Sequence, residues 1–159
     1  MSKQKKRLEK EKKRERARRV EKQRRIDADV CAELMFRSEL AWDDRDLEGC
    51  RRLLDKVLKI RPNHAEALER LAAAGFKLNR LEEGLAYFER LREAPRWPPV
   101  TYNAAVAAWN TGRIEQSKRW VAEFLEATRR SKQFVELRKS ARVMLKDAER
   151  RIKAEAARA

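Results

Sequence analysis

The stretch GFKLNRLEEGLAYFERL, residues 75–91, carries Gly75 and Gly84, two of the chain's four glycines, among apolar residues at helical spacing. A glycine inside a helix costs about 1 kcal/mol relative to alanine, so the pair needs a reason: a phosphate-binding loop or close packing of two helices. The sequence contains neither G-x-x-x-x-G-K-[ST] nor G-x-G-x-x-G. We therefore predict that both glycines mark close helix packing.

The size pattern around the two glycines recurs in three segments, residues 31–64, 65–97 and 98–130. Small residues share three positions of the repeat: Ser38, Ala72 and Ala105; Ala41, Gly75 and Ala108; Cys50, Gly84 and Ser117. Large residues share five others: Trp42, Phe76 and Trp109; Leu47, Leu81 and Ile114; Leu53, Tyr87 and Trp120; Leu54, Phe88 and Val121; Val57, Leu91 and Phe124. Each segment is predicted to form a helix, a short turn and a second helix.

Turn residues stand between the two predicted helices of each segment, as DDRD at 43–46, KLNR at 77–80 and NTGR at 110–113. We expect the second helices to begin near these residues: Asp46, Asn79 or Arg80, and Thr111 or Gly112. Pro62 and the stretch APRWPP at 94–99 are predicted to separate successive segments, because proline ends helices.

The repeat resembles the tetratricopeptide repeat family, a helix-turn-helix repeat of 34 residues. The family's two small positions match Ala72 and Gly84, its large residue four places later matches Phe88, and its late proline matches Pro62. The family's early tryptophan is replaced in the three segments, by Leu34, Leu68 and Thr101, and Arg129 stands at the third segment's late proline position. The resemblance covers about residues 31–130.

The predicted architecture is all-α: a right-handed α-solenoid of about three tetratricopeptide-like repeats. Residues 1–29 form a basic, flexible or partly helical arm, residues 30–132 the repeats, and residues 133–159 a C-terminal capping helix. The cap is predicted from one apolar stripe with steps of three or four residues: Phe134, Leu137, Ala141, Met144 with Leu145, Ala148 and Ile152. Such a helix covers the apolar face that a last repeat leaves open.

Charge is concentrated at the N-terminus. Residues 1–25 hold 14 Lys or Arg and 4 Glu, a net charge of +10, whereas the remaining residues hold 27 basic and 22 acidic groups, a net charge of +5. There is no apolar run of membrane-spanning length and no signal-peptide core. Cys31 and Cys50 are interpreted as free thiols in a reducing compartment, which favours a cytoplasmic protein.

Motifs for chemistry are missing from the sequence. His64 is the only histidine and is expected near a helix start, and two cysteines 19 residues apart do not make a zinc site. Cys50 is interpreted as a packing residue, because it shares a small position with Gly84. We predict no catalytic residue, no metal ligand and no cofactor, and therefore no enzyme.

A partner is expected on the first helices of the repeats, which line the concave face of such arrays. The predicted groove follows from the helical register next to the small positions: Met35, Glu39, Trp42, Glu69, Arg70, Phe76, Tyr102, Asn103, Val106 and Trp109. The three aromatic residues at the shared position (Trp42, Phe76, Trp109) either pack between repeats, the favoured interpretation, or contact a ligand directly. Met35 and Tyr102 are expected to be the more accessible residues. Arg70 and Asn103 do not reproduce the family's carboxylate clamp, so that specificity is not predicted.

The function expected is a non-catalytic protein-interaction module, an adaptor or scaffold that binds a peptide or helical segment. The alternative is a nucleic-acid- or ribosome-associated accessory protein whose basic arm makes nonspecific RNA or DNA contacts. The arm residues predicted for such contacts are Lys5, Lys6, Arg7, Lys12, Lys13, Arg14, Arg18, Arg19, Arg24 and Arg25. A monomer is favoured, and a third hypothesis makes the chain an accessory segment of a larger assembly.

Overall fold

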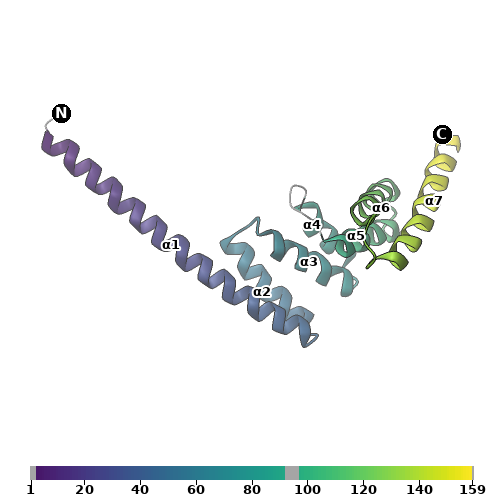
Figure 1. Cartoon of the computed structure of the whole chain (residues 1–159), viewed down its shortest axis with the longest axis horizontal. Helices are drawn as coiled ribbons and strands as arrows, with labels where there is room; N and C mark the ends of the chain where they lie inside the picture. Colours follow the sequence, from purple (N-terminus) through teal and green to yellow (C-terminus); the bar gives the residue numbers. More distant parts are fainter. Residues whose placement is uncertain (1–2, 92–96, 159) are drawn as a thin grey trace. The chain divides into compact units, whose positions relative to one another are not determined.

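The chain is helical throughout the part described by a computed structural model, residues 3–91 and 97–158, with short connections between the helices (Figure 1). The described helices are α1 (Lys3–Asp43), α2 (Leu47–Ile60), α3 (Ala65–Lys77), α4 (Leu81–Glu89), α5 (Pro98–Asn110), α6 (Ile114–Thr128) and α7 (Val135–Arg158). They fall into two compact units, Met1–Pro62 and Asn63–Ala159. The first unit contains α1 and α2, and the second contains α3 to α7.

The helix boundaries recur at the offsets of 34 and 33 residues that align the sequence segments. The first helices of the three pairs, which are the last part of α1, α3 and α5, end at Asp43, Lys77 and Asn110. The second helices, α2, α4 and α6, begin at Leu47, Leu81 and Ile114. The predicted helix-turn-helix repeats are therefore confirmed.

One turn geometry joins the two helices of every pair. The chain takes a left-handed conformation at Arg45, Asn79 and Gly112, with φ of 63°, 56° and 76°. In the second pair the Arg80 N–H donates to the Gly75 carbonyl (2.8 Å) and the Asn79 N–H donates to the Phe76 carbonyl (3.2 Å), and the other two turns have the equivalent bonds. These bonds satisfy carbonyls at the end of the first helix that have no partner within it.

This turn shows which residue precedes the second helix of the third pair, which begins near Gly112 as expected. Thr111 is the C-cap residue of α5 and Gly112 is the left-handed residue, so neither is the N-cap of α6. Arg113 is the N-cap residue of α6, as Arg80 is for α4. The physical reason is that a left-handed residue has to follow the first helix before the chain can reverse direction.

Side-chain caps begin α2 and α3. Asp46 accepts a hydrogen bond from the Gly49 N–H (2.8 Å), and His64 accepts one from the Ala67 N–H through Nδ1 (3.3 Å). His64 therefore lies at a helix start, as predicted. Pro62 lies between α2 and α3, whereas Pro98 and Pro99 open α5. Residues 94–96 of the predicted proline-rich separator lie outside the described residues.

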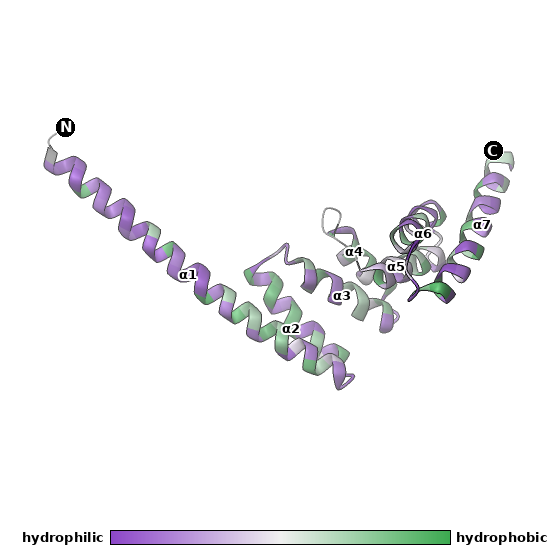
Figure 2. Cartoon of the chain, in the orientation of Figure 1, coloured by the Kyte–Doolittle hydropathy of each residue, from purple (hydrophilic) through white to green (hydrophobic). Residues whose placement is uncertain are grey.

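In the first unit, α2 packs along the C-terminal part of α1 (Figure 1). Cys31 and Ser38 of α1 and Cys50, Leu54 and Val57 of α2 are buried. Helix α1 runs without a break through residues 29 and 30, so the predicted arm continues the first helix. Its side chains are exposed from residue 4 to residue 26, and Figure 2 shows this part as predominantly hydrophilic.

In the second unit, α3 and α4 approach each other at the two glycines. A Cβ atom added at Gly84 would lie 2.6 Å from ring carbons of Phe76 and 3.0 Å from the Ala72 carbonyl oxygen. One added at Gly75 would lie 2.8 Å from the Gly84 Cα. Real Cβ atoms do not come this close to their neighbours, so close helix packing explains both glycines.

Helix α7 packs on α6 and closes the core of the last pair. Ala141 of α7 is buried with Ala105 of α5 and with Val121 and Phe124 of α6. The half-buried side chains around this cluster include four from the predicted stripe: Phe134, Leu137, Met144 and Leu145. The predicted capping helix is thus observed as α7.

Candidate partner-binding face

The predicted groove residues lie on the first helices of the three pairs. Met35, Glu39 and Trp42 are on α1, in the first unit. In the second unit the set is divided between α3 (Glu69, Arg70, Phe76) and α5 (Tyr102, Asn103, Val106, Trp109), and these two helices pack against each other. The second unit therefore brings seven of the ten residues onto two neighbouring helices.

Two charged members of the set have partners within the chain. Glu69 accepts a hydrogen bond through Oε2 from the backbone N–H of Trp97 (2.9 Å), the residue that precedes α5. Arg70 pairs with Glu66 one turn earlier on α3 (2.9 Å). Glu69 therefore serves as a side-chain cap for the next repeat, a role that the sequence analysis missed because the two residues are 28 positions apart.

The aromatic members in the second unit pack within it. Phe76 lies against Gly84, and Arg151 of α7 lies over the Trp109 ring, 4.5 Å from its centroid. These contacts agree with the packing interpretation for both residues. Tyr102 is half-buried, because its ring lies 5.3 Å from that of Phe124 and it packs on the cluster that α7 closes.

The remaining members of the set differ in exposure and polarity. Asn103 is exposed, Val106 is half-buried, and Ala73, which shares the repeat position of Val106, is half-buried on α3. In the first unit Glu39 is exposed, while Met35 and Trp42 are half-buried. In the second unit these residues can make apolar contacts through their methyl groups and hydrogen bonds through the Asn103 amide.

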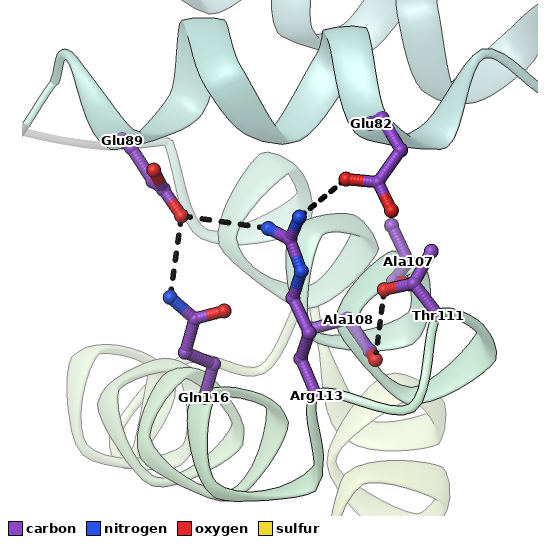
Figure 3. A network of polar contacts seen from close by, with 7 residues as sticks. All are labelled: Glu82, Glu89, Ala107, Ala108, Thr111, Arg113 and Gln116. Atoms are coloured by element: carbon purple, nitrogen blue, oxygen red, sulfur yellow. Dashed lines mark hydrogen bonds and ion pairs between the residues drawn. The ribbon is translucent and has the colours of Figure 1, made fainter.

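A polar network joins the last two pairs (Figure 3). Arg113, which precedes α6, pairs with Glu82 of α4 and lies 3.7 Å from the Glu89 carboxylate, and Gln116 donates to the same carboxylate (3.2 Å). The network holds α4 against the start of α6. Its residues come from the second helices α4 and α6 and from the turn before α6, so it helps to fix the repeats without occupying the predicted groove.

Residues 3–91 and 97–158 offer no group of three or more His, Cys, Asp or Glu side chains that could hold a metal ion. Over the same described ranges no helix has the length and apolarity needed to span a bilayer.

Sequence comparison and structure comparison give different results. No model of a protein family matches the chain, and no curated protein matches it by sequence. Among solved structures the chain is similar to the tetratricopeptide repeat domain of Sgt2 from Aspergillus fumigatus, with 18% identity, 81% of this chain and 82% of that chain covered, and a TM-score of 0.59. The chain has a tetratricopeptide-like fold.

Two further structures share these tetratricopeptide-like repeats. One is the N-terminal domain of stress-induced protein-1 from C. elegans, with 18% identity, 73% of this chain and 94% of that chain covered, and a TM-score of 0.58. The other is the type III secretion chaperone SycD of Yersinia enterocolitica in complex with a peptide of the translocator YopD. It has 12% identity, with 77% of this chain and 95% of that chain covered, and a TM-score of 0.66. The low identities mean that the fold is shared while the side chains are not.

Proposed function

We propose that the chain is a non-catalytic protein-interaction module that holds an extended peptide or a short helical segment against α3 and α5. The proposal rests on the exposed Asn103 and the half-buried Ala73 and Val106, on two first helices that pack side by side. We name these three residues the strip. The likeness to SycD, whose structure contains a bound peptide, supports it.

The strip suits a main chain better than a large anchor side chain. Ala73 and Val106 offer small apolar contacts, and the Asn103 amide can donate to and accept from a peptide group. Phe76 already packs against Gly84, and Arg151 lies over the Trp109 ring. Side chains ordered before binding lower the entropy lost when a partner binds. Met35, Glu39 and Trp42 remain predicted contacts of the first repeat, and the rest of the set remains predicted for the second unit.

A monomer in the cytoplasm is part of the proposal. Cys31 and Cys50 are both buried and do not form a disulfide with each other, which fits a reducing compartment.

The test begins with peptides selected from a displayed library on the unmodified full chain. Binding of a selected peptide is then measured by fluorescence anisotropy with two variants, Asn103→Arg and Val106→Arg. Both substitutions place a long charged side chain on the strip, so we expect each to weaken binding at least about tenfold, equivalent to about 1.4 kcal/mol.

The matched control is Ala122→Arg, which adds the same side chain at an exposed position of α6. It should leave the affinity for the peptide unchanged, and thermal melts of all three variants show whether the fold is kept. A library that yields no binder, or peptides that bind all three variants equally, would contradict the proposed strip.

A further inference from the structure

The N-terminal part of α1 is a lone helix surrounded by solvent. Every side chain from Gln4 to Arg25 is exposed, and this stretch carries 13 Lys or Arg and 4 Glu. A helix that is polar all round has no core to join. Its exposed surface is therefore mostly charged, with an excess of positive charge.

The cations are unevenly distributed around this helix. With about 100° of rotation per residue, five cations in three turns fall in one sector of about 120°: Lys6, Arg7, Lys10, Lys13 and Arg14. Arg24 and Arg25 extend the same sector toward the C-terminus. We name these seven residues the basic face.

The acidic residues lie mainly outside the basic face. Glu9, Glu11 and Glu15 are on the other sides of the helix, where Glu15 pairs with Arg19 (2.6 Å). Glu21 is the one acidic residue within the sector among Gln4–Arg25, and it pairs with Arg25 (3.2 Å). The first three turns of the basic face therefore present five positive charges with no carboxylate among them.

We infer that the basic face binds the phosphodiester backbone of a nucleic-acid duplex, and we favour B-form DNA over duplex RNA. This inference concerns the first unit and is independent of the peptide strip on α3 and α5. It narrows the predicted arm contacts to one face and adds Lys10 to them. Four residues predicted from the sequence lie on other sides of the helix and are left out of the inferred contact: Lys5, Lys12, Arg18 and Arg19.

The geometry favours a duplex over a single strand. No Phe, Trp or Tyr occurs in residues 1–25, so the helix has no ring on which an unpaired base could stack. Lys6 and Arg25 are about 28 Å apart along the axis at 1.5 Å per residue, most of a turn of B-DNA. The major groove of B-DNA is about 12 Å wide and admits an α-helix, whereas that of A-form RNA is deep and narrow.

An anionic membrane surface fits this helix poorly. Interfacial helices need a broad apolar face. Leu8 and Val20 are the large apolar side chains between Gln4 and Arg25, and by the same rotation they point about 120° apart. The helix therefore has charge for such a surface but no apolar face to bury.

The test uses the full chain and a labelled DNA duplex of mixed sequence, with anisotropy titrations from 50 to 200 mM salt. The variant Lys6→Gln/Lys10→Gln/Lys13→Gln removes three charges from the basic face. Its control, Lys5→Gln/Lys12→Gln/Arg16→Gln, removes three charges from another side of the same helix, so both have equal net charge. Circular dichroism verifies that both keep the helix.

We expect the logarithm of the association constant to fall linearly with the logarithm of salt concentration for the unmodified chain. The basic-face variant should lose at least about tenfold in affinity at low salt, and the magnitude of its salt slope should fall by about 2 to 3. The control variant should lose less than about threefold, and Asn103→Arg should bind DNA as the unmodified chain does.

Equal losses in the two triple variants would overturn the inference, because net charge and not one face would then govern binding. Failure to bind the duplex at 50 mM salt would overturn it as well. Tighter binding to single-stranded RNA, or to vesicles containing phosphatidylserine, would assign the arm to another partner. An RNA duplex bound as tightly as DNA would overturn the choice of B-form DNA.

Discussion

At Gly84 the two helices of the second repeat leave no room for a side chain. The equivalent positions in the other repeats hold Cys50 and Ser117, both buried, so the approach at Gly84 is a local feature of α3 and α4. The nearest obstacle is the ring of Phe76, which lies over the glycine. The predicted groove residue Phe76 is thus part of the reason that residue 84 is a glycine.

Replacing Gly84 with leucine should lower the free energy of unfolding by about 1–3 kcal/mol, because a larger side chain overpacks the α3–α4 contact. Chemical denaturation of the full chain measures it. Ala86→Leu makes a like change at an exposed position of the same helix and should be close to neutral. An unfolding midpoint unchanged by Gly84→Leu would show that the helices do not pack as described.

A substitution at Arg45, in contrast, is expected to stabilise the chain. It holds a φ of 63° in the turn after α1, where the third repeat has Gly112. Left-handed backbone is unfavourable for a residue with a Cβ atom, so Arg45→Gly should stabilise the chain by up to about 1 kcal/mol. Arg45→Lys keeps the strain and should have no effect. A lower unfolding midpoint for Arg45→Gly would contradict this turn geometry.

Among the elements, α7 has the largest effect on what the last repeat exposes. Without it, Val121 and Phe124 of α6 would lose the side chains that cover them. The helix also places Arg151 over Trp109 and closes the cluster on which Tyr102 packs. The capping helix therefore shapes the predicted groove as well as the core.

The packing of α7 predicts that substitutions at two positions of this helix differ greatly in their effect on stability. Ala141 is fully buried, while Val143 is 62% exposed. Ala141→Arg should destabilise the chain by about 3 kcal/mol or more, because it forces a charge into an apolar contact. Val143→Arg should be nearly neutral. Thermal melts distinguish them, and equal melting temperatures would mean that α7 does not cover α6.

Sequence patterns predicted where the helices begin, but they did not predict several contacts of individual side chains. Residue size at fixed offsets marks the helix starts at Leu47, Leu81 and Ile114, because each repeat solves the same packing problem. The bond from Trp97 to Glu69 and the contact of Trp109 with Arg151 leave no periodic signal. Trp97 lies in the connection before α5, and Arg151 lies in the capping helix α7. Nothing in the residue type of Arg45 indicates its left-handed conformation; only its alignment with Gly112 does.

Across the whole molecule, the long N-terminal part of α1 contributes charge and no core. Its side chains from residue 4 to residue 26 are exposed. Removing residues 1–26 should therefore leave the melting temperature and the affinity for a selected peptide unchanged, while duplex binding is lost. A markedly lower melting temperature in the shortened chain would show that the arm supports the repeats.

Peptide binding at the strip on α3 and α5 is the role that we propose for the tetratricopeptide-like repeats of this chain. Its most direct test is NMR mapping of the backbone amides of the full chain as a library-selected peptide is added. We expect the largest shift changes to cluster on the strip, at Ala73, Asn103 and Val106. Changes concentrated instead at Arg119 and Ala122, on the exposed side of α6, would contradict it.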